Sequence, residues 1–181
     1  DIGYQSYRED EGKMSHNHHP RDQKVSATFA LLVTSDSRTP DTDETGKLAK
    51  KLLSEAGHEV VEYGIVPNDS GKIKDWLANV IENSETQIII TSGGTGIGSV
   101  DKTVDTAKKL FEKELPGFGE YFRRLSYDEI GTPGLMSRST AGVVNKKIIF
   151  CLPGSRGAMK TALNKIILPG IGHMIWELNR R

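Results

Sequence analysis

A glycine-rich stretch followed by two carboxylates is the part of this 181-residue sequence best suited to chemistry. Residues 91–98 read Thr-Ser-Gly-Gly-Thr-Gly-Ile-Gly, and Asp101 and Asp105 follow them. An apolar run at 88–90 precedes the stretch and an amphipathic pattern begins at Val104, which predicts the order strand, turn, helix. Such a turn presents unpaired backbone N–H groups and the positive end of a helix dipole. The pattern therefore favours a phosphate site at the glycines and a metal at the carboxylates.

A purely structural explanation of the same residues stays open at this point. Tight turns need glycine for positive φ angles, and acidic residues in the first turn of a helix stabilise its dipole. Of two well-known nucleotide-binding patterns, the standard P-loop is excluded and the dinucleotide site is disfavoured. The stretch lacks the Gly-Lys-Ser/Thr ending of a P-loop, and Gly94-x-Gly96-x-Gly98 does not match the G-x-G-x-x-G dinucleotide fingerprint.

The surrounding chain predicts three successive β-then-α units. The strands are expected at residues 29–33, 60–66 and 87–91, and a hairpin is expected to pair 143–144 with 148–152 through a turn at 145–147. Between the second and third strands, apolar residues at helical spacing place Trp76 in the core. Later helices are expected at about 117–128, 156–167 and 170–179. Successive units of this kind predict a three-layer αβα fold with a mostly parallel sheet.

Small polar residues also follow the other predicted strands. Ser35 and Asp36 follow the first strand, and Asn68 and Asp69 follow the second. The turn Pro153-Gly154-Ser155 follows the last strand and opens a helix. Ligands of open α/β sheets bind at the carboxyl ends of the strands, so these residues are expected near the glycines. A capped turn without a ligand explains Ser35 and Asp36 equally well.

Composition narrows the classes of function. Lysine plus arginine and aspartate plus glutamate both number 24, so binding of nucleic acid or an anionic membrane through bulk charge is not expected. The single cysteine, Cys151, excludes an internal disulfide and a multi-cysteine zinc site, and its apolar neighbours predict a buried strand residue. No apolar run approaches the ~20 residues of a membrane span and no signal-peptide pattern is visible. A cytoplasmic protein is therefore expected.

The first residues differ in character from the rest. Residues 1–25 are polar and aperiodic, and they are predicted to be disordered or a leader segment, with residues 26–181 as a single domain. His16, His18 and His19 could bind a metal, but they lack a carboxylate or cysteine partner. A polar tail is the favoured interpretation.

The motifs taken together resemble the molybdopterin adenylyltransferases, the MogA, MoaB and gephyrin G-domain proteins of molybdenum cofactor biosynthesis. The signature is Thr91 to Gly96 followed by Asp101-x-Thr103-x-Asp105. The other blocks are Ser35-Asp36-Ser37, Asp43-x-x-Gly46, Ile65-Val66-Pro67, Pro116-Gly117-Phe118-Gly119-Glu120, Leu135-Met136-Ser137-Arg138 and Leu152-Pro153-Gly154-Ser155. The resemblance extends over residues 28–178, and the MoaB branch is favoured.

The resemblance implies a MogA-like α/β fold that forms a homotrimer or homohexamer. It also implies a reaction in which Mg-ATP adenylylates molybdopterin, giving adenylyl-molybdopterin and pyrophosphate before a molybdenum-insertion enzyme acts. Mg²⁺ is then the expected metal, and ATP and molybdopterin are the expected substrates.

The resemblance further implies roles for individual residues. The expected catalytic residues are Asp101, Asp69 and Asn68, of which Asp101 and Asp69 are the expected Mg²⁺ ligands. The expected substrate- and nucleotide-binding residues are Ser35, Asp36, Ser92, Gly93, Gly94, Thr95, Gly96, Ser137, Arg138, Pro153, Gly154 and Ser155.

One position departs from the family pattern. Asn68 stands where the family commonly has an aspartate that contributes to magnesium binding or catalysis. Asparagine brings no charge, so either Asp69 takes over this role or the metal is bound more weakly. The departure leaves a non-catalytic molybdopterin-binding or carrier protein as the alternative to an enzyme.

Overall fold

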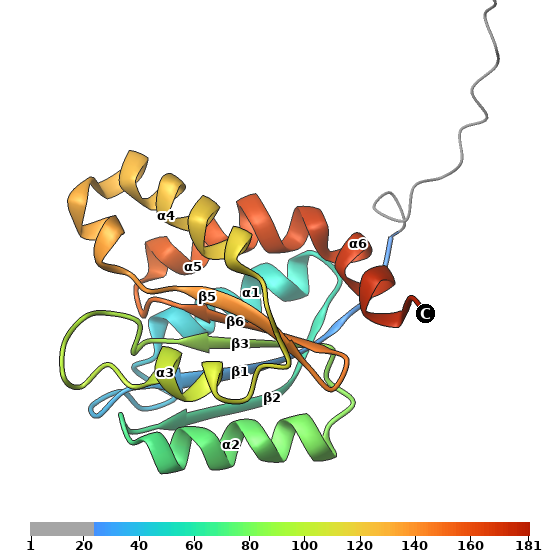
Figure 1. Ribbon diagram of the computed structural model, residues 1–181, viewed down its shortest axis with the longest axis horizontal. Helices are drawn as coiled ribbons and strands as arrows, with labels where there is room; N and C mark the ends of the chain where they lie inside the picture. Colours follow the sequence, from blue (N-terminus) through green and yellow to red (C-terminus); the bar gives the residue numbers. More distant parts are fainter. Residues whose placement is uncertain (1–23) are drawn as a thin grey trace, which may run out of the picture.

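The computed structural model describes residues 24–181, which include a six-stranded sheet with helices on both faces (Figure 1). The strand order is β2-β1-β3-β6-β5-β4. The parallel strands are β2 (Glu59–Val66), β1 (Thr28–Thr34), β3 (Ile88–Ser92) and β6 (Lys147–Leu152). The antiparallel strands are β5 (Thr140–Val144) and β4 (Lys113–Glu114). The predicted three-layer αβα fold with a mostly parallel sheet is confirmed.

The two faces of the sheet bury separate apolar clusters. One face is covered by α1 (Glu44–Glu55), α4 (Pro116–Ile130), α5 (Arg156–Ala162) and α6 (Leu168–Asn179). The other face is covered by α2 (Ser70–Asn83) and α3 (Thr103–Lys108). Side chains alternate along β1, so Phe29, Leu31 and Val33 join the first cluster while Ala30 and Leu32 join the second. The continuous apolar run of the sequence is thus explained by burial on both faces.

Two predicted core residues lie where the sequence places them. Trp76 of α2 is half-buried, packs against the second cluster, and lies so close to Gly64 in β2 that any Cβ there would overlap its indole nitrogen. Cys151 of β6 is fully buried. Burial raises the pKa of its thiol to about 11, and the neighbouring Thr91 hydroxyl opposes this effect.

The β5–β6 turn is tighter than predicted. It consists of Asn145 and Lys146 alone, with φ angles of 47° and 57°. This is the geometry of a two-residue hairpin that matches strand twist. Lys147, predicted in the turn, instead begins β6, and its buried ammonium donates to the carbonyls of Ser84 and Thr86 in the connection between α2 and β3. Desolvation lowers the pKa of Lys147.

The last two predicted helices form one continuous helical stretch. A break was predicted before residue 170, but α5 continues through the π-helical segment η3 (Leu163–Ile167) directly into α6. Pro169 has no N–H to donate to the preceding turn, and the wider π turn stands immediately before it. The stretch therefore passes the proline without ending.

The helix after the glycine stretch is shorter than its apolar pattern predicts. It ends at Lys108, and Phe111 leaves the helix to pack its ring against Gly142 of β5. The next residues pair with β5 as β4, a strand that has only two residues. No periodic pattern can reveal so short a strand. A short 3₁₀ helix, η2 (Thr132–Met136), follows α4.

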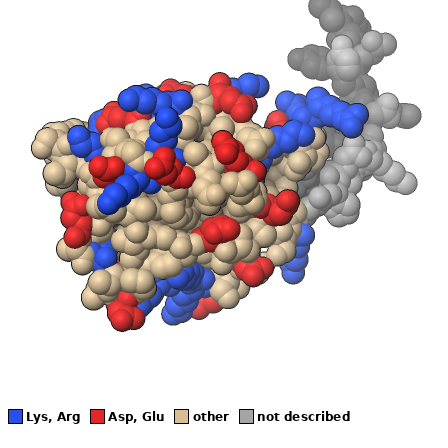
Figure 2. Space-filling model, turned by 90° about the horizontal axis from the view of Figure 1, so that it is seen from below, with Lys and Arg blue, Asp and Glu red and all other residues tan. Residues whose placement is uncertain are grey.

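The surface shows no strong charge bias on the face drawn in Figure 2, where acidic and basic side chains are interspersed. None of the helices within residues 24–181 is long and apolar enough to cross a membrane. The predictions for His16, His18 and His19, and for nearly all of the segment 1–25, lie outside the described residues.

Candidate active site

The loops that carry the predicted site residues meet at one edge of the sheet, on the left in Figure 1. Parallel pairing of β2, β1, β3 and β6 places all four carboxyl ends at this edge. The antiparallel β5 begins there, so Ser137 and Arg138, which precede it, reach the same edge. The edge is where open α/β sheets bind ligands.

The glycine loop leaves three consecutive N–H groups free. Gly93 and Gly94 have φ angles of +105° and +69°, which turn the chain sharply after β3. The N–H of Gly93 donates to the carbonyl of Leu152 in the neighbouring strand, 2.9 Å away. The N–H groups of Gly94, Thr95 and Gly96 find no acceptor within the described part of the chain. The N–H of Gly93 is therefore used within the sheet, and the N–H groups of the next three residues are available to bind an anion.

Tight contacts explain why glycine stands at the first two positions. A Cβ on Gly93 would lie 2.6 Å from the Thr34 carbonyl oxygen, and one on Gly94 would lie 2.9 Å from Thr103 Cβ. Thr103 also donates its N–H to the Gly94 carbonyl at 3.2 Å and shares a 3.1 Å hydrogen bond with the Thr34 hydroxyl. The loop is thus held between the end of β1 and the start of α3. Close packing and positive φ angles therefore explain why glycine stands at these positions, and the same loop also has free N–H donors.

The two carboxylates behind the glycines have different surroundings. Oδ2 of Asp101 accepts the N–H of Gly98 at 2.9 Å, and its Oδ1 accepts no hydrogen bond from residues 24–181. Asp105 forms a two-pronged ion pair with Arg138, with N···O distances of 2.8 and 3.1 Å. The hydrogen bonds from the guanidinium hold the pKa of the Asp105 carboxyl below its usual range. Only Asp101 keeps a free carboxylate oxygen.

Asn68 is paired with Asp36 across the loops that follow β2 and β1. The backbone N–H of Asn68 donates to Asp36 Oδ1 at 2.9 Å, and its side-chain amide donates to Oδ2 at 3.0 Å. These hydrogen bonds lower the pKa of the Asp36 carboxyl. Asp69 caps α2 by accepting the N–H of Lys72 at 2.9 Å. Asn68, the residue at the position that departs from the family pattern, therefore acts as a hydrogen-bond donor to the Asp36 carboxylate.

The turn at residues 153–155 packs against the glycine loop. A Cβ on Gly154 would lie 3.6 Å from the Cα of Gly93. The Gly154 carbonyl accepts both terminal nitrogens of Arg38 at 3.2 Å and the Thr45 hydroxyl at 2.8 Å. Ser155 caps α5 with its hydroxyl. Arg38 was missed from the sequence, although its position at the end of the Ser35-Asp36-Ser37 block was a usable signal.

A buried carboxylate supports Arg38. Asp43 is fully buried, accepts the Gly46 N–H at 2.9 Å and the Tyr63 hydroxyl at 2.7 Å, and lies 3.9 Å from an Arg38 nitrogen. A Cβ on Gly46 would overlap the Asp43 carboxylate. Burial and the adjacent Asp43 raise the pKa of Tyr63. The Asp43-x-x-Gly46 block is therefore explained by packing, and its carboxylate helps to hold the 153–155 turn through Arg38.

The segment before β5 is bonded to the glycine loop. The N–H of Arg138 donates to the Thr95 carbonyl at 2.7 Å, and the Ser137 hydroxyl lies 3.4 Å from the Thr95 hydroxyl. Ser137 also shares a 2.7 Å hydrogen bond with the Ser139 hydroxyl, and Arg123 of α4 donates to the Ser139 carbonyl at 2.7 Å. These contacts connect α4, β5 and the loop.

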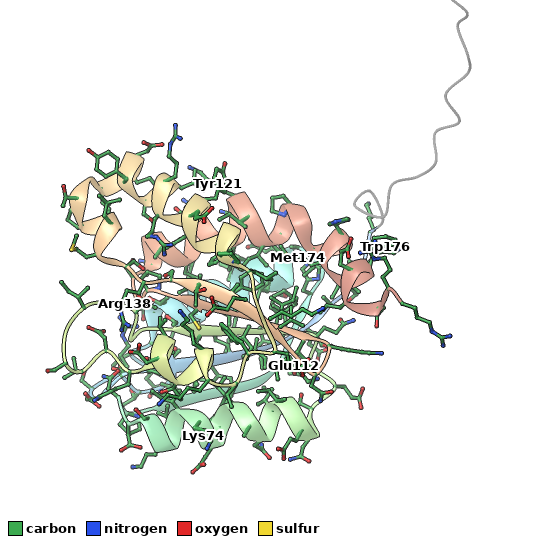
Figure 3. All side chains as sticks on the ribbon, viewed as in Figure 1. Lys74, Glu112, Tyr121, Arg138, Met174 and Trp176 are labelled. Atoms are coloured by element: carbon green, nitrogen blue, oxygen red, sulfur yellow. The ribbon has the colours of Figure 1, made fainter. Side chains whose placement is uncertain are left out.

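The Arg138–Asp105 ion pair lines two cavities. One, of about 460 Å³, is also lined by Glu120 and Arg123, and the other, of about 430 Å³, is also lined by Asp101. The loops that follow β1, β2 and β6 border neither of these two cavities. Figure 3 places Arg138 at the edge of the sheet beside the loop that follows β3.

The chain matches a known family over most of its length. Residues 30–173 match a family described as a probable molybdopterin binding domain. The chain belongs to this family. The resemblance inferred from its motifs is confirmed.

Relatives in the family match nearly the whole chain. Molybdenum cofactor biosynthesis protein B of Staphylococcus carnosus is 46% identical over 158 residues, a match that covers 83% of this chain and 90% of the relative. A crystal structure of a molybdenum cofactor biosynthesis protein B has a TM-score of 0.84 at 39% identity, covering 88% of this chain and 99% of its own. The structure of the tungsten cofactor synthesizing protein MoaB from Pyrococcus furiosus has a TM-score of 0.75 at 36% identity, covering 86% and 98%.

In this member of the molybdopterin-binding family, the assignment of single residues to catalysis, substrate or Mg²⁺ stays a prediction. No group of three or more histidine, cysteine or acidic side chains in the described chain lies close enough together to hold a metal. Mg²⁺ is commonly bound by one or two carboxylates together with substrate phosphates and water. The free oxygen of Asp101 fits that kind of site. Asp69, whose carboxylate caps α2, is the second predicted ligand.

Ser92, the last residue of β3, adds an unpaired group beneath the loop. Its side chain is fully buried and its hydroxyl has no hydrogen-bond partner among residues 24–181. An unsatisfied buried hydroxyl costs roughly 1–3 kcal/mol. The hydroxyl of the preceding residue, Thr91, is likewise buried without a partner among these residues, so the unpaired hydroxyl does not by itself assign Ser92 to the site, and its role stays a prediction.

Proposed function

We propose that this chain acts in molybdenum cofactor biosynthesis by adenylylating molybdopterin with Mg-ATP. A phosphate oxygen of molybdopterin attacks the α-phosphorus of ATP, the bond from that phosphorus to the bridging oxygen breaks, and pyrophosphate leaves. A phosphate monoester is largely ionised near pH 7, so the attacking oxygen needs no base from the protein. The observation that best supports the proposal is the row of three free N–H groups, 94–96, next to Asp101.

The proposed division of roles follows from the free groups at the edge. The N–H groups of Gly94, Thr95 and Gly96 bind one phosphate, and Asp101 holds Mg²⁺. When bound, Mg²⁺ would neutralise charge on the triphosphate. The second anion is bound at the edge by Ser137 and by the turn 153–155. The protein's contribution is to hold two polyanions in line, which is the main requirement of phosphoryl-type transfer.

The reaction can be tested directly on the purified full chain. The protein is incubated with molybdopterin, ATP and Mg²⁺, and adenylyl-molybdopterin and pyrophosphate are quantified. Asp101→Asn keeps the size of the side chain but removes its charge, and it should lower turnover by roughly 100-fold or more. Asp128→Asn, in an exposed part of α4, is the matched control. If Asp101→Asn turns over as fast as wild type, the role assigned to Asp101 is wrong.

Asn68 supports a second candidate function, a non-catalytic molybdopterin-binding or carrier protein. The side chain carries no charge, and its amide and the backbone N–H of Asn68 both donate to Asp36, so it brings no carboxylate to a metal. A carrier would bind molybdopterin tightly and release no pyrophosphate.

Asn68→Asp distinguishes a weakened enzyme from a carrier. The substitution places two carboxylates side by side, raises the pKa of Asp36, and offers Mg²⁺ a stronger site. A large rise in turnover with lower Mg²⁺ requirement indicates a weakened enzyme. Tight molybdopterin binding with no product from either protein indicates a carrier.

The proposal includes the wider setting of the protein. It places the chain in the cytoplasm as a homotrimer or homohexamer, with adenylyl-molybdopterin passing to a molybdenum-insertion enzyme. Light scattering coupled to size-exclusion chromatography measures the subunit number, and a monomer would contradict this part.

A further inference from the structure

The guanidinium of Arg138 is almost fully used within the chain. Its Nε donates to the Gly96 carbonyl at 2.8 Å, Nη1 donates to Asp105 at 2.8 Å, and Nη2 donates to Asp105 at 3.1 Å and to the Asp101 carbonyl at 3.4 Å. An arginine has five N–H donors, and four of them are engaged here. Figure 3 shows Arg138 at the loop side of the sheet. The group therefore connects two points of the glycine loop with a carboxylate of α3.

We propose that Arg138 is a positioning residue that Asp105 holds against the loop 95–101, where it fixes the carboxylate of Asp101. Arg138 then acts through the loop and not as a ligand of the substrate phosphates. The consequence for Mg²⁺ rests on the role that the proposed function gives to Asp101.

The loop has few other connections to the rest of the described chain. The two hydrogen bonds between Gly98 and Asp101 lie within it, at 3.1 and 2.9 Å. The side chains of Ile97 and Val100 are 73% and 60% exposed, so their burial contributes little to holding the loop in place. The remaining bonds lead from Thr95 to the backbone of Arg138 and to the Ser137 hydroxyl. Among residues 24–181, the guanidinium is thus the one side chain that hydrogen-bonds to the loop near both of its ends, at Gly96 and at Asp101.

The paired geometry favours positioning over substrate binding. Asp105 neutralises the guanidinium and occupies its fork, so a phosphate would first have to displace the carboxylate. The planar guanidinium donates to the Gly96 carbonyl and to Asp105 at once in a fixed geometry, whereas a lysine ammonium is a point charge without this fork. Because the Arg138 and Asp105 side chains are 37% and 59% exposed, the pair should add little to global stability. Loss of the Arg138–Asp105 ion pair should therefore destabilise the loop locally and leave the global stability almost unchanged.

Hydrogen–deuterium exchange of the ligand-free full chain tests the positioning role. The reporter is a peptide that covers residues 93–104, which includes the Gly98 amide bonded to Asp101. Arg138→Lys and Asp105→Asn should each speed exchange in this peptide by roughly tenfold, the equivalent of about 1.4 kcal/mol of local stability. The melting temperature should hardly change. Arg124→Lys, at an exposed position of α4, is the matched control and should leave the peptide unaffected.

Binding of Mn²⁺-ATP, with Mn²⁺ as a paramagnetic probe for Mg²⁺, tests the link to Asp101. Electron paramagnetic resonance should show the dissociation constant rising about tenfold in both Arg138→Lys and Asp105→Asn. Exchange that stays at the wild-type rate while nucleotide or molybdopterin affinity falls would identify Arg138 as a ligand and overturn the proposal. Faster exchange with unchanged Mn²⁺-ATP binding would overturn the link to Asp101.

The two proposals can fail separately. If the wild-type chain neither binds Mn²⁺-ATP nor forms product, the proposed function fails. The exchange rates of the ligand-free variants still decide whether Arg138 holds the loop, since that measurement needs no ligand.

Discussion

Replacing Gly94 by alanine tests the contacts that shape the glycine loop. Gly94 has a φ of +69°, where an L-residue with a side chain costs about 1–2 kcal/mol. The new Cβ would also overlap Thr103 Oγ1 and lie 2.9 Å from Thr103 Cβ, and overpacking of this kind costs about 1–3 kcal/mol. The free energy of unfolding should therefore fall by about 2–5 kcal/mol, a large part of the ~5–15 kcal/mol typical of a domain.

Two other glycines separate these contributions. Gly57, which follows the C-cap residue of α1, has a φ of +85° but no atom within 4 Å of an added Cβ, so Gly57→Ala should cost only the backbone part, about 1–2 kcal/mol. Gly117 lies in α4 with open space around it, so Gly117→Ala should stabilise by about 0.5–1 kcal/mol. Thr103→Ala in the Gly94→Ala background removes the closest atom and should restore part of the loss.

Urea denaturation followed by tryptophan fluorescence and circular dichroism measures these differences. The slope of unfolding free energy against urea should stay constant across the variants, so that midpoints report stability. If Gly94→Ala loses no more stability than Gly57→Ala, then the Thr103 contact does not restrict the loop and the steric reasoning is wrong. Failure of Thr103→Ala to restore any stability would point to the same conclusion.

Three further predictions concern groups away from the loop. Tyr63→Phe removes a hydrogen bond to the buried Asp43 carboxylate and should cost about 1.5–3 kcal/mol in urea denaturation, while Tyr127→Phe, at an exposed position, should cost almost nothing. Burial lowers the pKa of His58 below its ordinary value of 6.5, so as the pH falls below 6.5 the unfolded chain binds a proton before the folded chain does. The free energy of unfolding should therefore decrease as the pH is lowered through this range. An equal dependence on pH in His58→Gln would contradict this. The Cys151 thiol, with its pKa raised to about 11, should react with a maleimide at pH 8 only as fast as the chain unfolds, and rapid labelling of the folded protein would show that it is accessible.

The sequence by itself determined the architecture and the family. Short continuous apolar runs that end in turn residues predict strands buried on both faces, and β1 and β3 are such strands. The helical spacing around Trp76 determined α2 and the face that it buries. Small polar residues directly after the strands determined the edge at which the site lies, because parallel strands end together. These features depend on patterns of residues near one another in the sequence, so the sequence alone predicts them.

The tertiary structure decided which atoms remain free at that edge. Sequence alone could not show that the Gly93 N–H is bonded to Leu152, or that Asp105 is paired with Arg138 while Asp101 keeps an open oxygen. Asn68 and Asp36 are 32 positions apart, Arg138 and Asp105 are 33 apart, and Arg38 and Gly154 are 116 apart. Hydrogen bonds over such separations are set by strand order and loop packing, which no local periodicity records. The motifs showed which residues reach the site, and the fold decided which of them can still bind something.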